Sequence, residues 1–324
     1  MEENYTDYIE ENDFKSLSVI NTYMTSDMIL RLSPRRMIAL TDGRSSTSID
    51  NADIASKMIV KGKYVALIAG RAGATQEMIR DWNDYQPIGN FSKELEILTN
   101  SFHKIYEKTW VSEKLKPHGI EDSEEYETGN LKNGKPISVD LLRKLQNETE
   151  EYVKPDSSGS SRFSSYIIYG GQDEERKDME IYEISGAGNC EFISDHFCTG
   201  GIGSLISRLE LGEFIETLPP EKRDDIDFVK GLHKSLVALA KSEKAHGVGG
   251  IPTVADIGTD GVKIYDSKVS RVMRNVVVKE LKGFLEKDKA ESYLEGLANG
   301  KIEVSIVENE IYNPKDLENF NLSM

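Results

Sequence analysis

The side chains that could do chemistry are few, and they form no familiar metal or nucleotide motif. Asp195-His196 lies near serines and His246 near glycines, so either histidine could act as a base, although a structural loop or core histidine is the simpler interpretation. No serine has the spacing of a nucleophile elbow. Cys190 and Cys198 form no CxxC pair, and we expect both to be buried. Because phosphate-loop, HExxH and EF-hand patterns are missing too, we predict no metal and no cofactor.

The charge of the chain argues against two classes of partner. Its 324 residues carry a formal net charge of −16, and phosphates are bound by clustered Lys and Arg. We therefore expect neither a nucleic acid nor an anionic membrane as partner. No stretch approaches the roughly 18 apolar residues that span a bilayer, and the start of the chain lacks the features of a signal peptide. We expect a cytoplasmic protein.

The first third of the chain predicts four strands and then helices. Two apolar runs, 27–32 and 36–41, flank the turn-forming Ser33-Pro34-Arg35 and predict a hairpin. Runs 55–60 and 64–69 predict two more strands, and the second of these is almost wholly apolar, as in a strand buried on both faces. Apolar residues at helical spacing then predict a long helix over about 92–114.

The rest of the chain repeats this order after an interruption. Residues 116–162 contain an acidic run and a Ser/Gly-rich end, and we interpret them as an insertion with one helix near 138–150. Strands are predicted at 163–170, 179–185 and 190–198, helices at 204–212 and from Pro219, strands at 252–257 and 261–265, a helical stretch at 272–297 and a last strand at 302–307. Strands grouped apart from helices indicate an α+β fold, and a four-layer αββα sandwich of two antiparallel sheets flanked by helices accommodates the order.

Five groups of residues carry a family resemblance. In chain order they are Met37 to Arg44, Ala55 to Ile59 with Val65 to Gly70, Tyr166 to Gly171 with Met179 to Ile184, Phe197 to Gly203, and Gly249 to Val254 with Asp260 to Val262. Together they resemble the strands and glycine turns of proteasome subunits, which belong to the N-terminal-nucleophile (Ntn) hydrolases. The resemblance covers roughly 25–115 and 163–266. We therefore expect a proteasome-like domain at 25–266 with the insertion at about 116–162, preceded by a segment at 1–24 (a propeptide or gating helix) and followed by a C-terminal helical extension at 267–324.

The resemblance also implies a catalytic set. In this family a Thr, elsewhere Ser or Cys, becomes the first residue by self-cleavage, and its α-amine, with a pKa near 8, accepts the hydroxyl proton. Here Asp42 and Lys57 are fifteen residues apart, and Ser26, preceded by Thr25, lies sixteen before Asp42. Thr25 or Ser26, Asp42 and Lys57 are therefore the candidate catalytic residues, and N–H groups at the Gly70 turn would form the oxyanion hole. A turn-capping Asp and an edge Lys are the structural alternative.

Several positions depart from the family pattern and keep other functions open. Met24 precedes Thr25, where self-cleaving subunits usually have Gly, and Ala245, Val248 and Gly201 fall where the family has supporting polar residues. One hypothesis is a peptidase or amidohydrolase acting on a polypeptide substrate. A second is a non-catalytic structural or gating subunit that assembles with itself or related subunits in a ring or dimer. A third is a stand-alone relative whose insertion and tail recognise one partner protein.

Overall fold

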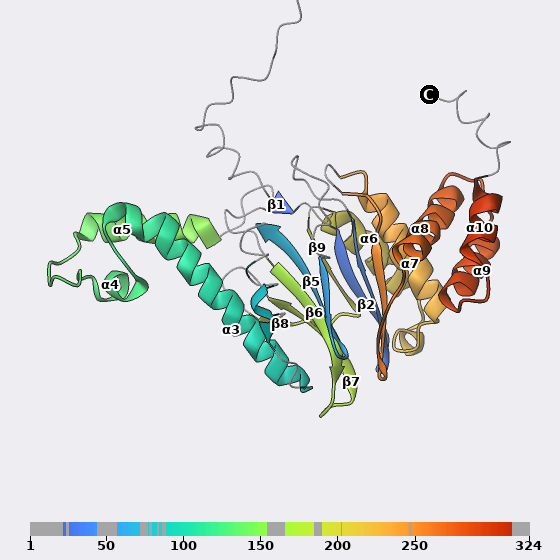
Figure 1. The fold of residues 1–324 in the computed structure, drawn as a ribbon, viewed down its shortest axis with the longest axis horizontal. Helices are drawn as coiled ribbons and strands as arrows, with labels where there is room; N and C mark the ends of the chain where they lie inside the picture. The colour runs from blue at the N-terminus through green and yellow to red at the C-terminus, as the bar shows by residue number, and fades with distance from the viewer. Residues whose placement is uncertain are drawn as a thin grey trace, which may run out of the picture.

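The computed structural model describes residues 22–23, 26–43, 57–71, 77, 80–82, 84–85, 89–153, 166–184, 190–201, 203–245 and 248–312. Two antiparallel sheets lie against each other at the centre, and helices cover the outer face of each (Figure 1). The predicted α+β sandwich of four αββα layers is thereby confirmed. The predicted strand 55–60 lies partly, and the predicted N-terminal segment 1–24 almost wholly, outside the described residues.

The strands of the described residues form two sheets. One has the order β1-β5-β6-β7-β8, with β4 also paired to β5, and the other has the order β11-β10-β3-β2-β9. The strands are β1 Thr22–Tyr23, β2 Asp27–Ser33, β3 Arg36–Thr41, β4 Met58–Lys61, β5 Tyr64–Arg71, β6 Tyr166–Asp173, β7 Asp178–Ile184, β8 Cys190–Phe192, β9 Phe197–Gly200, β10 Thr253–Gly258 and β11 Gly261–Ile264.

The predicted hairpin is formed by β2 and β3. Side chains alternate along a strand, so Met28 and Leu30 face the helices that cover this sheet, whereas Ile29 faces the other sheet. Both faces are buried, which explains the nearly continuous apolar sequence. A β-bulge between Arg31 and Ser33 shifts the pairing by one residue near the turn.

A helical layer covers the outer face of each sheet (Figure 1). On the β5–β6 side, α3 (Phe91–Trp110) contributes Phe91, whose ring centroid lies 4.9 Å from that of Tyr169 in β6. On the β2–β3 side lie α6 (Ser204–Thr217) and α7 (Phe228–Ser242). The helix predicted to start at Pro219 begins instead at Phe228, because the Asp227 side chain caps it by accepting the Lys230 N–H at 3.0 Å.

The predicted insertion contains two α-helices rather than one in its described part, after a 3-10 turn at Lys116–His118. They are α4 (Ser123–Thr128) and α5 (Val139–Val153), which project beyond the sandwich with the end of α3 (Figure 1). The helix α4 was not predicted because its sequence is an acidic run. Its Glu125 is nonetheless buried and accepts the Glu121 N–H at 2.6 Å. Ile120 and Leu145 join the core under α3, so this segment packs as part of that layer.

The predicted strand 190–198 is wrong, because its two ends belong to different sheets. Cys190 lies in β8 and Cys198 in β9, and the chain bends at Asp195-His196 between them. Cys198 is buried as expected, but Cys190 is exposed on the edge strand β8.

The end of the described chain is helical throughout. The stretch 272–297 forms two helices, α8 (Ser267–Leu281) and α9 (Lys287–Ala298), separated at Gly283, whose φ is 78°. The strand predicted at 302–307 is instead part of α10 (Val304–Ile311). Its apolar side chains Val307 and Ile311 lie one helical turn apart and are both buried against the neighbouring helices.

The contact between α7 and β2 depends on a helical glycine and yields a test. A Cβ at Gly231 would lie 2.3 Å from Cδ2 of the buried Leu32, whereas one at Gly212 of α6 would lie no closer than 3.8 Å to any atom. We expect Gly231→Ala to lower the free energy of unfolding by about 1–3 kcal/mol through overpacking. Gly212→Ala should instead raise it by up to about 1 kcal/mol, because Ala favours helix. Urea unfolding of both variants measures the contrast, and equal effects would contradict it.

Candidate active site

A buried ion pair joins the two sheets at one end of the sandwich. Asp42 follows β3 in one sheet and Lys57 precedes β4 in the other, and the Lys57 ammonium donates to Asp42 Oδ1 at 2.8 Å. Their side chains are 1% and 7% exposed, so neither charge is screened much by solvent. The Ile68 N–H donates to the Lys57 carbonyl at 2.8 Å, which fixes the lysine backbone against β5.

Asp42 is held by two backbone donors besides Lys57. The Ser26 N–H donates to Oδ1 at 3.2 Å, and the Gly249 N–H donates to Oδ2 at 3.0 Å. A buried carboxylate needs such donors, because its loss of hydration is otherwise uncompensated. The next residue, Gly43, has no room for a side chain, since a Cβ there would lie 1.9 Å from the Ile251 carbonyl oxygen. The 249–251 segment is thus held close to the end of β3.

Ser26 lies in the same cluster through its backbone, but its hydroxyl is hydrogen-bonded to a residue of α6. Its Oγ lies 3.0 Å from Oγ of Ser207 in α6, and both residues are buried. A Cβ at Gly203 would lie 2.8 Å from Ser26 Oγ, so the turn before α6 packs tightly on this serine. The structure therefore brings the Ser26 backbone to Asp42 and the Ser26 hydroxyl to Ser207.

A second carboxyl, that of Asp27, lies beside this ion pair. Asp27 is fully buried, and its Oδ2 accepts a hydrogen bond from the Tyr166 hydroxyl at 2.8 Å. Burial raises the pKa of Asp27 to about 6, although the Lys57 charge and hydrogen bonds from Thr41 and Tyr166 oppose that rise. Nothing in the sequence pattern singled out Asp27 or Tyr166, because they are 139 residues apart.

The remaining predicted site residues have different fates. Thr25 lies outside the described residues. Gly70 lies within β5, opposite Tyr23 of β1, rather than in a turn after the strand. Val248 is buried and precedes Gly249, so the backbone at this point supplies the donor to Asp42 that its side chain cannot.

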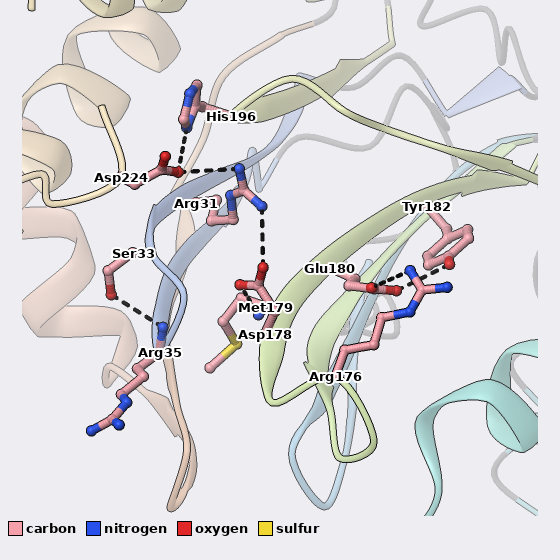
Figure 2. A network of polar contacts seen from close by, with 10 residues as sticks. All are labelled: Arg31, Ser33, Arg35, Arg176, Asp178, Met179, Glu180, Tyr182, His196 and Asp224. Atoms are coloured by element: carbon pink, nitrogen blue, oxygen red, sulfur yellow. Dashed lines mark hydrogen bonds and ion pairs between the residues drawn. The ribbon is translucent and has the colours of Figure 1, made fainter. Parts of the chain in front are cut away.

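Of the two histidines considered as bases, His246 lies outside the described residues, and His196 has other partners than Asp42 and Lys57. His196 Nδ1 lies 3.7 Å from Asp224, which also pairs with Arg31 of β2 at 3.3 Å (Figure 2). Burial and the nearby Arg31 lower the pKa of His196. Arg31 also lies 3.9 Å from Asp178 of β7, so this network connects the two sheets four residues along β2 from Asp27.

The described residues contain neither a metal-binding cluster nor a membrane-spanning helix. No group of three or more His, Cys, Asp or Glu side chains among them is placed to hold a metal ion. None of the helices in this part of the chain has the length and apolar character needed to cross a membrane.

Comparison with solved structures supports the fold. The chain is similar to a Gly-1 mutant of Anbu, a proteasome-like protein, from Hyphomicrobium sp. strain MC1. The TM-score is 0.50 at 15% sequence identity, and the match covers 80% of this chain and 96% of that one. This chain therefore has a proteasome-like, Ntn-hydrolase fold. No protein-family profile and no curated protein sequence matches it.

The ion pair predicts an asymmetric response to mutation. Asp42→Ala removes the acceptor of the Lys57 ammonium and of the Ser26 and Gly249 N–H groups, and we expect it to cost about 3–5 kcal/mol of stability. Lys57→Met leaves Asp42 with both backbone donors, so it should cost at least about 1 kcal/mol less. Chemical unfolding at pH 7 measures both variants. A larger loss in Lys57→Met than in Asp42→Ala would contradict this account.

Proposed function

We propose that this protein is a proteasome-like Ntn hydrolase that cleaves an amide bond in a polypeptide. The observation that carries the proposal is the buried Asp42–Lys57 pair, joined at 2.8 Å beside the first residues of β2, on a proteasome-like fold. Its two members are fifteen residues apart, which is close to the spacing that the family resemblance implies. The nucleophile is the hydroxyl of Thr25 or Ser26, exposed as a chain terminus after removal of the preceding residues.

The proposed chemistry assigns one task to each group. The new α-amine, with a pKa near 8, accepts the proton of the hydroxyl on its own residue. The Lys57 ammonium stabilises the alkoxide that forms, and this effect is stronger in a buried site than in water. Asp42 holds the ammonium in place, and the N–H groups of Ser26 and Gly249 fix the orientation of the carboxylate. Attack on a substrate carbonyl forms the C–O bond and breaks the amide C–N bond, and the leaving amine takes the proton held by the α-amine. Water then hydrolyses the acyl-enzyme and releases the carboxylic acid.

Of the two candidate nucleophiles, we favour Thr25. The Ser26 hydroxyl already has a partner in Ser207, and the Ser26 N–H donates to Asp42 within the intact chain. Cleavage before Thr25 leaves both of these hydrogen bonds unchanged. Cleavage before Ser26 would require its hydroxyl to leave Ser207 before it could react near Lys57.

A non-catalytic role is the second candidate. Ala245 and Val248 occupy positions where the family has hydrogen-bonding side chains, and this departure favours a structural, gating or partner-binding subunit. Assembly with copies of itself or with related subunits fits either candidate, because it belongs to the proteasome-like resemblance. Light scattering of the purified protein tests that assembly separately from catalysis.

Intact-mass analysis distinguishes the two candidates. We expect freshly purified protein to lose 24 residues on incubation if Thr25 is the nucleophile and 25 if Ser26 is. Thr25→Ala should remain full length, whereas Ser26→Ala should still be processed.

A matched lysine provides the control. Lys57→Met should abolish processing, because the ammonium that stabilises the alkoxide is lost. Lys61→Met should not, although Lys61 is equally buried, because its ammonium donates to the Tyr85 carbonyl at 2.6 Å instead. A stable full-length mass in the wild-type protein would support the non-catalytic role. Processing that persists in both Thr25→Ala and Ser26→Ala would exclude self-cleavage at this point.

A further inference from the structure

Asp27 occupies the centre of three paired strands at the site end of the sandwich. It is the first residue of β2, with Thr41 of β3 on one side in register and Gly200 of β9 on the other. It is fully buried, so its carboxyl is placed between protein groups rather than in water. A carboxyl in such a position is costly to ionise unless the structure supplies donors or a cation.

Gly200 allows a tyrosine from the opposite sheet to reach this carboxyl. A Cβ at position 200 would lie 2.2 Å from the ring of Tyr166, so the ring occupies the space that a side chain there would fill. From that position the Tyr166 hydroxyl donates to Asp27 Oδ2 at 2.8 Å. Gly200 and Tyr166 thus form a specific binding arrangement, called the holder below, for the buried Asp27 carboxylate.

The charges around Asp27 belong to the candidate active site. The Lys57 ammonium attracts the Asp27 carboxylate, and the Asp42 carboxylate repels it. The Tyr166 hydroxyl of β6 adds a hydrogen bond at 2.8 Å, whereas Gly200 of β9 brings no charge. Two carboxyls from neighbouring strands therefore act on a single ammonium.

We propose that Asp27, held by the Tyr166 hydroxyl, is a positioning residue of this site, whose carboxylate is the second anion that fixes the Lys57 ammonium. The expected effect of Asp27 on catalysis rests on the proposed hydrolase function, whereas its electrostatic effect on Lys57 does not. When Asp27 is protonated, Lys57 loses the attraction of one of the two carboxylates, Asp27 and Asp42, that act on it among the described residues. A neutral carboxyl also accepts the Tyr166 hydrogen bond less strongly, so the holder loosens.

The pH dependence follows from this arrangement. Because the pKa of Asp27 is raised to about 6, the carboxylate is lost as the pH falls through that value. We expect activity to fall about tenfold per pH unit below about 6, with kcat affected more than KM, since Asp27 acts through Lys57 and not on the substrate. The α-amine titrates near pH 8 and gives a separate limb of the profile.

The test is the rate of hydrolysis of fluorescein-labelled casein from pH 5 to pH 8. Asp27→Asn should lower kcat and remove the limb near pH 6. Tyr166→Phe should move that limb to higher pH, because the hydrogen bond that favours the carboxylate is gone. Tyr169→Phe is the control, since Tyr169 is a buried tyrosine of the same strand that packs on Phe91 instead. A limb that persists in Asp27→Asn, or that stays in place in Tyr166→Phe, would overturn the proposal.

A second measurement needs no catalytic activity. In protein labelled with ¹³C at aspartate, the Asp27 carboxyl should titrate near pH 6, and Lys57→Met should move its midpoint upward because the attracting cation is removed. An unchanged midpoint in Lys57→Met would overturn the proposed contact of charges. If casein and the chain itself stay uncut at every pH, the proposed function fails, while this titration still decides the role of Asp27.

Discussion

The structure at this end of the molecule depends on one buried ion pair between the two sheets. Removing Lys57 and Asp42 from water is unfavourable by several kcal/mol per ion, and attraction compensates only when the geometry is good and the remaining hydrogen-bonding positions are filled. Here the Asp42 carboxylate meets an ammonium and two backbone N–H groups, from the residue before β2 and from the segment after α7. Three separate parts of the chain must therefore be correctly placed before the pair is stable.

Glycines make that placement possible by letting backbones and rings approach closely. Gly43 allows the end of β3 to touch the carbonyl of Ile251, and Gly203 allows the start of α6 to touch Ser26. A single added methyl group would clash at either glycine, so the site tolerates little change at these two positions. In the sequence, glycines predicted turns. The role of Gly43 and Gly203 in the close packing around Asp42 became visible only in the fold.

Features encoded by contiguous residues could be predicted from the sequence, whereas contacts between distant residues could not. The β2–β3 hairpin was predictable because its apolar runs and the intervening Pro34 are contiguous. Asp42 and Lys57 were singled out by the family resemblance together with their spacing. The Ser26–Ser207 contact joins residues 181 apart, and no local pattern marks such a pair. The tail was misread for the opposite reason: a short apolar run from 302 to 307 fits a strand or a helix, and packing against the neighbouring helices decided for α10.

Register explains why residue counting alone does not identify the nucleophile. In the β2–β3 hairpin Asp27 pairs with Thr41, so Ser26 lies opposite Asp42 at a separation of sixteen residues. The bulge between Arg31 and Ser33 adds one residue to β2 without advancing the pairing, and a hairpin without it would reach the same register with a separation of fifteen. A count of sixteen thus selects the residue whose N–H supports Asp42. The Ser26 hydroxyl contacts Ser207 of α6, so this count does not by itself identify the residue that reacts at Lys57.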